Sequence, residues 1–177
     1  MADLLFLVGM MGAGKTTVGR LVAERLARDF VDTDAEIEAR TGKAIGAIFA
    51  AAGEQAFRDE ECRLLGELAL RTAPAVVSVG GGAVIDERNR AAMRGAGTVV
   101  WLRADPAVLA ARTAGEAADR PLLAAAGTDG ATAALERLVE ARRGWYEEVA
   151  TVVVDVDELT PDEAASAVLG ALGVGTA

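Results

Sequence analysis

An α/β fold, with helices on both faces of a mostly parallel sheet, is what this sequence predicts. Several short segments are apolar at consecutive positions, which is typical of strands that are buried on both faces. Helical patterns lie between these segments, so strands and helices alternate along the chain. The 177 residues suffice for one well-formed core and are few for two, so we expect a single domain.

Turn and capping residues support the ends of several elements. Gly42 follows the second helical pattern, Pro74 lies near the end of the third, and the last opens with Thr160 as a cap and Pro161 at the first helical position. The strand at residues 30–32 is predicted more weakly than the others. The expected strands cover residues 4–8, 30–32, 75–79, 98–102 and 151–154, and the expected helices cover residues 16–28, 34–41, 53–71, 86–94, 129–149 and 161–172.

The composition excludes several kinds of function. A net charge of −9 argues against a nucleic-acid-binding surface, because phosphate backbones are bound by positively charged faces. There is no histidine, so acid–base chemistry falls to carboxylates, Lys, Arg or Tyr. Cys62 is the single cysteine, and we interpret it as a partly buried apolar side chain in a reducing cytoplasm. Asp3 stands where a leader would have a basic cluster, and the apolar stretches are short, so we expect a cytoplasmic protein without a membrane partner. We also expect a monomer.

The loop between the first strand and the first helix matches the phosphate-binding pattern G-x-x-x-x-G-K-[ST]. It reads Gly-Met-Met-Gly-Ala-Gly-Lys-Thr-Thr over residues 9–17, and the matching residues are Gly9, Gly14, Lys15 and Thr16. In such a loop the backbone N–H groups converge on phosphate oxygens, Lys15 reaches the terminal phosphates, and the Thr16 hydroxyl can ligate Mg2+. A glycine-rich turn without a ligand is the alternative. The chain has only two lysines, Lys15 and Lys43, which makes a chance match rare.

Two aspartates follow the second expected strand. Alternate residues of an extended segment point the same way, so Asp32 and Asp34 are expected to project together from the carboxyl end of that strand. Open parallel sheets bind ligands at this edge. An Mg2+ ion held by Thr16 needs a nearby carboxylate, for which Asp32 is suited, and a hydroxyl acceptor needs a base, for which Asp34 is suited. Asp34 can also be read as the cap of a helix that starts at Ala35, and the two roles are compatible.

Three glycines, Gly80, Gly81 and Gly82, come directly after the third expected strand. Their lack of Cβ atoms lets a ligand lie against bare backbone at the same sheet edge as the phosphate loop. A loop that needs positive φ angles is the alternative reading. Another candidate, Arg58, lies one helical turn from Glu61, where a solvated ion pair on an ordinary helix surface is the default interpretation.

Residues 113–130 are rich in glycine and show little periodicity, so we expect them to form a mobile segment. Arg120 lies within this segment, where its cation would close over the phosphates and stabilise charge in the transferring group. Arg142 and Arg143 lie near the end of the long helix at 129–149. Periodicity leaves open which of these two arginines faces inward.

Taken together, these motifs resemble the shikimate kinase family, and they occur in that family's order along almost the whole chain. No single run is decisive, whereas the ordered set of six is highly specific. The runs are Gly-Met-Met-Gly-Ala-Gly-Lys-Thr-Thr (9–17), Phe-Val-Asp-Thr-Asp (30–34), Gly-Glu-Gln-Ala-Phe-Arg (53–58), Val-Gly-Gly-Gly-Ala (79–83), Arg-Pro-Leu-Leu (120–123) and Arg-Arg-Gly-Trp-Tyr-Glu-Glu-Val-Ala (142–150).

The resemblance implies a three-layer α/β/α phosphate-loop kinase fold with a five-stranded parallel sheet. The implied reaction transfers the γ-phosphoryl group of ATP, with Mg2+, to the 3-hydroxyl of shikimate. The implied division of the chain is a core at 1–32, 62–112 and 131–177, an acceptor-binding region at 33–61, and a lid at about 113–130.

The resemblance also assigns roles by motif position. Thr16 would bind Mg2+ with Asp32 behind it, and Asp34 would contact the substrate hydroxyls. Arg58 and Arg142 would hold the substrate carboxylate. The family's arginine lies four residues before its tyrosine, which selects Arg142 over Arg143. The catalytic residues would be Lys15, Asp34 and Arg120, the substrate ring would approach Gly80, Gly81 and Gly82, and the ATP phosphates would contact Arg120, Gly12, Ala13, Gly14, Lys15, Thr16 and Thr17.

The chain departs from the family in places. Gly144 stands where the family often has proline, and Trp145 replaces a common leucine. After the last strand, where members often carry an arginine that packs on adenine, residues 155–160 read Asp-Val-Asp-Glu-Leu-Thr. Arg112, just before the expected lid, would supply a cation to stack on the base instead.

Two other functions compete with this reading. The nearer one is another small-molecule kinase of the same architecture, acting on gluconate or a nucleoside monophosphate. A nucleotide acceptor would need aromatic or amide contacts, and the stretch from Asp34 to Glu61 offers only Phe49, Phe57 and Gln55. The other is a nucleotide-dependent switch without catalysis, which would not need an acceptor pocket.

Overall fold

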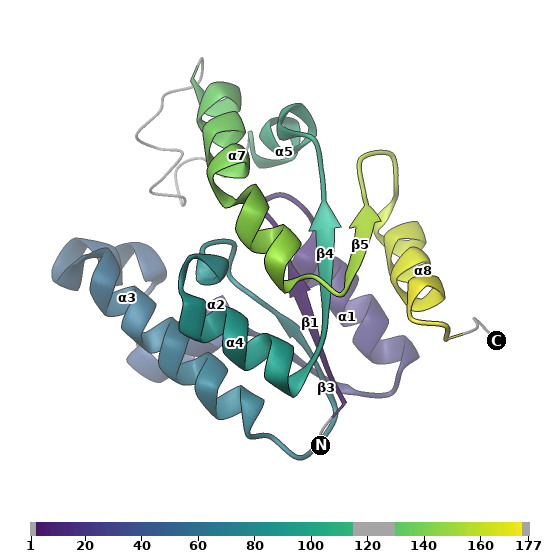
Figure 1. Ribbon diagram of the computed structural model, residues 1–177. Helices are drawn as coiled ribbons and strands as arrows, with labels where there is room; N and C mark the ends of the chain where they lie inside the picture. The colour runs from purple at the N-terminus through teal and green to yellow at the C-terminus, as the bar shows by residue number, and fades with distance from the viewer. Residues whose placement is uncertain (1–2, 115–129, 175–177) are drawn as a thin grey trace.

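The computed structural model describes residues 3–114 and 130–174, which form a five-stranded parallel sheet flanked by helices (Figure 1). The strand order is β2-β3-β1-β4-β5. All four pairings are parallel, so the carboxyl ends of the strands meet at one edge. The strands are β1 (Leu4–Val8), β2 (Asp29–Asp32), β3 (Ala75–Ser78), β4 (Gly97–Arg103) and β5 (Val152–Asp155).

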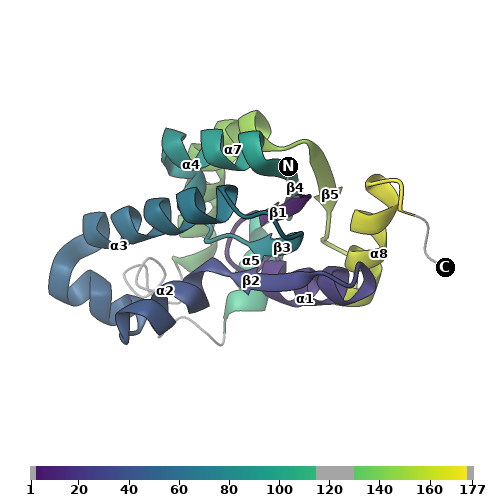
Figure 2. The same ribbon diagram turned by 90° about the horizontal axis from the view of Figure 1, so that it is seen from below.

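Helices cover both faces of the sheet and give the fold three layers (Figure 2). Helices α1 and α8 pack against each other on one face, and α3, α4 and α7 lie together on the other. The helices are α1 (Lys15–Arg25), α2 (Thr33–Thr41), α3 (Ile45–Ala69), α4 (Glu87–Ala96), α5 (Pro106–Thr113), α7 (Ala131–Val149) and α8 (Pro161–Ala171), and a 3-10 turn, η1, spans Ala83–Ile85.

The core lies along the central strands. Every residue of β1 and β3 is buried, as expected for strands covered on both faces. In the pairing of β1 with β4, Leu4 lies opposite Gly97, where an added Cβ would lie 2.7 Å from the Leu4 carbonyl carbon. The outer strands β2 and β5 each have a single neighbour and are less buried, which explains why β2 gives a weak apolar signal.

The predicted α/β/α class is confirmed, and the predicted strands agree with the structure to within one residue at each end. Helix α3 consists of two helical segments that meet at Gly53, whose φ of 82° and ψ of 169° are not helical, and the helix predicted from Gly53 corresponds to the second segment. The first segment, which begins at Ile45, was not predicted. Helix α5 was not predicted, although Asp105 accepts a hydrogen bond from the Ala107 amide and Pro106 opens the helix.

Residues 115–129 contain most of the expected lid, including Arg120, and lie outside the described part of the chain. The expected lid therefore stays a prediction. In the ranges that the structure does describe, no helix is both long and apolar enough to cross a bilayer.

Candidate active site

A cleft of about 1050 Å3 opens at the carboxyl edge of the sheet. The phosphate loop lines one part of it, the start of α2 and the middle of α3 line another, and the three glycines after β3 lie between them. Ligands of open parallel sheets bind at this edge, and here the strand order places β1 beside β3. The segments that the sequence singled out therefore share one cleft.

The phosphate loop has a backbone that only glycine adopts easily. Gly9, Gly12 and Gly14 have φ angles of 147°, 80° and 85°. An added Cβ on Gly9 would lie 2.5 Å from the Leu102 carbonyl oxygen, so β4 also excludes a side chain there. Within the described residues no side chain caps α1, whose first N–H groups therefore remain available to phosphate oxygens.

Lys15 and Thr16 open α1 and face the cleft. The Lys15 Nζ donates to the Met10 carbonyl at 3.0 Å, which holds the side chain over its own loop. The Thr16 hydroxyl donates to Asp32 Oδ2 at 2.6 Å and lies 3.4 Å from the Ser78 hydroxyl. A cation bound beside Thr16 would thus be surrounded by the side-chain oxygen atoms of Thr16, Asp32 and Ser78.

This oxygen-rich corner fits Mg2+, which prefers oxygen ligands and is usually bound through one or two protein groups plus phosphates and water. Among the described residues no group of three or more acidic, cysteine or histidine side chains converges to hold a metal. Any Mg2+ bound beside Thr16 and Asp32 must therefore draw further ligands from the nucleotide. The donor set suits a metal–nucleotide complex better than a permanent metal site.

Asp32, and not Asp34, caps helix α2. Asp32 Oδ1 accepts from the amides of Asp34 and Ala35 at 3.1 and 3.3 Å, and the helix begins at Thr33. The alternative reading of Asp34 as a cap is therefore wrong, as is the expectation that the chain is still extended there. Both aspartates nevertheless line the cleft.

Part of the Asp34 carboxylate lacks a hydrogen-bond partner. Asp34 Oδ1 is buried and makes no hydrogen bond to any described residue. Burial raises the pKa of this carboxyl, while the nearby Lys15 charge opposes the rise. The carboxylate can therefore accept a further hydrogen bond within the cleft.

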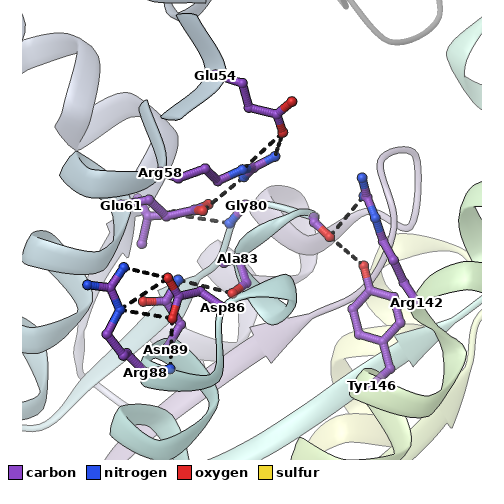
Figure 3. A network of polar contacts seen from close by, with 12 residues as sticks. Glu54, Arg58, Glu61, Gly80, Ala83, Asp86, Arg88, Asn89, Arg142 and Tyr146 are labelled. Carbon is purple, nitrogen blue, oxygen red and sulfur yellow. Dashed lines mark hydrogen bonds and ion pairs between the residues drawn. The ribbon is translucent and has the colours of Figure 1, made fainter. Parts of the chain in front are cut away.

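Arg58 is not the solvated surface arginine that helical periodicity suggested. Its side chain is 13% exposed and bridges Glu54 and Glu61, each at 2.9 Å (Figure 3). Glu61 is fully buried, and burial raises its pKa to about 7 against the opposing charge of Arg58. Sequence reasoning missed Glu61, because its position on α3 looks like ordinary helix surface.

At each of the three glycines, an added Cβ atom would lie close to different neighbours. An added Cβ on Gly80 would lie 2.7 Å from both Asp34 Oδ1 and Glu61 Oε1, and one on Gly82 would lie 2.6 Å from a nitrogen of Arg58. An added Cβ on Gly81 would lie 3.2 Å from the Gly9 carbonyl oxygen. None of the three has a positive φ, so that alternative is wrong, and the absence of Cβ atoms instead leaves room for the neighbouring side chains and backbone.

The structure distinguishes the two adjacent arginines of α7. Arg142 is 5% exposed, lines the cleft and donates to the Gly81 carbonyl at 3.2 Å (Figure 3). Arg143, in contrast, is exposed and pairs with Glu140. In the described part of the chain no ion pair joins Arg142 to a carboxylate. Its charge is therefore available to an anion in the cleft.

Tyr146, one turn beyond Arg142, fixes the position of α7. Its hydroxyl donates to the same Gly81 carbonyl at 2.7 Å, and its ring stacks on Trp101 of β4 with centroids 5.3 Å apart. The helix is thus anchored to both the glycine loop and the sheet. This anchoring orients Arg142 toward the cleft.

Arg112 lines the cleft at the end of α5 and also holds the loop that follows β5. It donates to the carbonyls of Val156 and Asp157 at 2.7 and 3.1 Å. The guanidinium thus organises the segment in which the family's C-terminal arginine is replaced.

The arrangement combines two sites of different charge. One is a nest of backbone N–H groups with a lysine and a hydroxyl, which suits a polyphosphate. The other combines Arg142, which is buried, with Arg58, which is 13% exposed, and suits a small acid that carries hydroxyls. Asp34 lies on the wall of the same cleft. A phosphoryl group bound to the first site would face a hydroxyl bound to the second.

Glu61 should give the folding stability a measurable pH dependence. The pKa of Glu61 is about 7 in the folded protein against an ordinary value of 4.5. The contribution of protonated Glu61 to the free energy of unfolding is therefore fully present below about pH 4.5 and is lost as pH rises through about 7. As pH rises from about 4.5 to about 7, the free energy of unfolding of Glu61→Gln should increase by on the order of 3 kcal/mol relative to that of wild type, since glutamine does not ionise. Urea unfolding of both proteins at several pH values measures this difference.

Glu54→Gln is the matched control, because it removes the other carboxylate partner of Arg58 from a half-exposed position. A difference between Glu61→Gln and wild type that stays constant across this pH range would contradict the assignment.

The chain is similar to known proteins along almost its whole length. A model of the family described as shikimate kinase matches residues 11–173. A shikimate kinase from Ralstonia nicotianae is 46% identical over 170 residues, which cover 96% of this chain and 87% of the relative. The structure of shikimate kinase from Acinetobacter baumannii in complex with shikimate matches with a TM-score of 0.88 at 36% identity, over 97% of this chain and 93% of that chain.

A gluconokinase from Sinorhizobium meliloti 1021 matches with a TM-score of 0.62 at 23% identity, over 97% of this chain and 91% of that chain. This likeness shows a common fold alone.

Proposed function

The chain belongs to the shikimate kinase family, and from that premise we propose which of its residues carry the transfer of the γ-phosphoryl group of ATP to the 3-hydroxyl of shikimate. The observation that carries the proposal is the shared cleft. Lys15 of the phosphate loop lines the same cavity as Arg58 and Arg142, with Asp34 also on its wall. In-line transfer requires the two substrates to meet in this way.

On the nucleotide side, we propose that Gly12, Ala13, Gly14 and Thr17 bind phosphate oxygens through the backbone N–H groups of the loop. Lys15 balances the charge of the terminal phosphates, and Thr16 with Asp32 holds the Mg2+ that neutralises phosphate charge. Arg112, already fixed by the loop after β5, packs on the base.

On the acceptor side, residues 33–61 and the glycine loop bind shikimate. Arg58 and Arg142 hold its carboxylate, and Gly80, Gly81 and Gly82 allow the ring to lie close to the backbone. Asp34 accepts the hydrogen of the 3-hydroxyl and orients that oxygen toward the γ-phosphorus. Arg120 would stabilise the transferring group by its motif position, and it lies outside the described residues.

An assay of ADP release with different acceptors tests this function. Shikimate, gluconate, AMP, CMP and water alone are supplied in turn with ATP and Mg2+. The proposal predicts release that depends on shikimate. A preference for gluconate or a nucleotide would indicate another small-molecule kinase, and release without any acceptor would indicate a switch.

Adjacent arginines on α7 allow a matched test of the carboxylate site. Arg142→Ala should raise the apparent KM for shikimate by roughly 10- to 100-fold, because it removes a charged partner from a buried site. Arg143→Ala should leave that KM within about twofold, since an exposed pair with Glu140 contributes little. Steady-state kinetics with shikimate as the varied substrate measures both.

Equal KM values for Arg142→Ala and Arg143→Ala would contradict the assignment. Circular dichroism of both variants establishes that the fold is retained.

A further inference from the structure

Two buried carboxylate oxygens meet at the acceptor end of the cleft without partners. Asp34 Oδ1 and Glu61 Oε1 make no hydrogen bond to any residue that the structure describes. Both would lie 2.7 Å from a Cβ added to Gly80, so both lie beside that glycine, next to which Glu61 is seen in Figure 3. Two buried acceptors in the same place would both be satisfied if one of them carried a hydrogen and donated it to the other.

The charged groups that face Glu61 come from three helices. Arg58 of α3 donates to Glu61 Oε2 at 2.9 Å, Arg142 approaches from α7, and Asp34 approaches from α2. The two cations offset the negative charge of Glu61, while Asp34 opposes it. The ionised form of Glu61 is therefore stabilised only as long as neither arginine binds another anion.

An acceptor carboxylate would change this balance. Bound to Arg58 and Arg142, it adds a negative charge to a group of side chains that is already shielded from water. Because it also pairs with Arg58, it weakens the interaction by which Arg58 stabilises the negative charge of Glu61. A buried carboxylate that must share its cation with a second anion is costly to keep ionised, so it takes up a proton and becomes neutral.

We propose that Glu61 takes up a proton from solvent when the carboxylate of the acceptor binds Arg58 and Arg142. The proton forms an O–H bond on Glu61 Oε1, which then donates to Asp34 Oδ1, while Oε2 continues to accept from Arg58. The second oxygen of Asp34 stays free to accept from the substrate hydroxyl. Glu61 is thus a positioning residue, acting through Arg58 and Asp34. The inference rests on the proposed function, because it requires the acceptor at Arg58.

The pH dependence of acceptor binding follows from the pKa of Glu61 in the protein without ligand. Without ligand, burial raises the pKa of Glu61 to about 7, and the added negative charge of the acceptor raises it further. Binding above neutrality therefore takes up a proton. Acceptor affinity falls as pH rises above about 7, approaching tenfold per pH unit where one full proton is taken up.

Calorimetric titration with shikimate in phosphate and in Tris at about pH 7.5 measures the uptake, because the two buffers differ in protonation enthalpy. Wild type should take up a large fraction of one proton, and Glu61→Gln none, with an affinity that does not vary with pH. Glu54→Gln should keep the uptake. Difference infrared spectra should show the C=O band of a protonated carboxyl on addition of shikimate to wild type, and no such band for Glu61→Gln.

Binding by wild type without proton exchange from about pH 6.5 to 8.5 would overturn the inference and leave the proposed function intact. Uptake by Glu61→Gln equal to that of wild type would place the proton elsewhere and also overturn it. An absence of any shikimate binding by wild type would instead refute the proposed function.

Discussion

Replacing Lys15 by alanine is expected to lower turnover by roughly 100- to 1000-fold, in the range measured for removal of one preorganised donor to transition-state charge. Lys15 is held over the phosphate loop by the Met10 carbonyl, so its charge is already in place when the γ-phosphoryl group moves. Phosphoryl transfer needs little covalent chemistry from the protein, and positioning with charge neutralisation supplies most of the rate. Shikimate affinity should change little, because the acceptor pocket does not include this side chain.

Lys43 provides the control, since it is the other lysine of the chain and is exposed. Lys43→Ala should retain wild-type turnover. Turnover at saturating ATP and shikimate, together with shikimate affinity from calorimetry, separates the two effects. A Lys15→Ala enzyme that keeps more than about a tenth of wild-type turnover would show that the loop lysine does not stabilise the transferring group.

Asp34→Asn is expected to reduce turnover by about 100- to 10,000-fold, the range found for loss of a general base. Asparagine keeps the size of the side chain but cannot accept the proton of the 3-hydroxyl. Asp34 lines the cleft together with the phosphate loop and the two arginines, as expected of a group that serves a ligand. Binding of shikimate should weaken far less than turnover.

Glu36→Gln is the control for Asp34→Asn, because Glu36 lies on the same helix but points to solvent and pairs with Arg40. It should behave as wild type in turnover and binding. If Asp34→Asn instead lost affinity and turnover in equal proportion, Asp34 would be a binding group without a role in proton transfer.

The fold was largely predictable from sequence, because its signals are local. Strands β1 and β3 are buried on both faces and so are apolar at every position. The first segment of α3 escaped prediction, since residues 45–52 are apolar and carry no charged side chain to mark a polar face, and Gly53 then interrupts the helix with a positive φ. Asp105 and Pro106 did carry a start signal for α5, and it was overlooked.

The site was predictable only in part, because burial of charged groups depends on distant neighbours. The phosphate loop has a motif with a mechanism, so Lys15 and Thr16 could be named from sequence. Arg58 and Glu61 look like a surface pair, and only the glycine loop after β3 shows that they are enclosed. The choice of Arg142 over Arg143 likewise depends on how Tyr146 anchors α7, which no local pattern contains.

The central claim is that the phosphate loop and the two-arginine pocket serve one reaction across one cleft. A crystal structure with shikimate and a non-hydrolysable ATP analogue with Mg2+ tests it most directly. The account predicts the shikimate carboxylate on Arg58 and Arg142, and its 3-hydroxyl between Asp34 and the γ-phosphorus. Shikimate bound away from the terminal phosphate, or with its carboxylate on other residues, would contradict it.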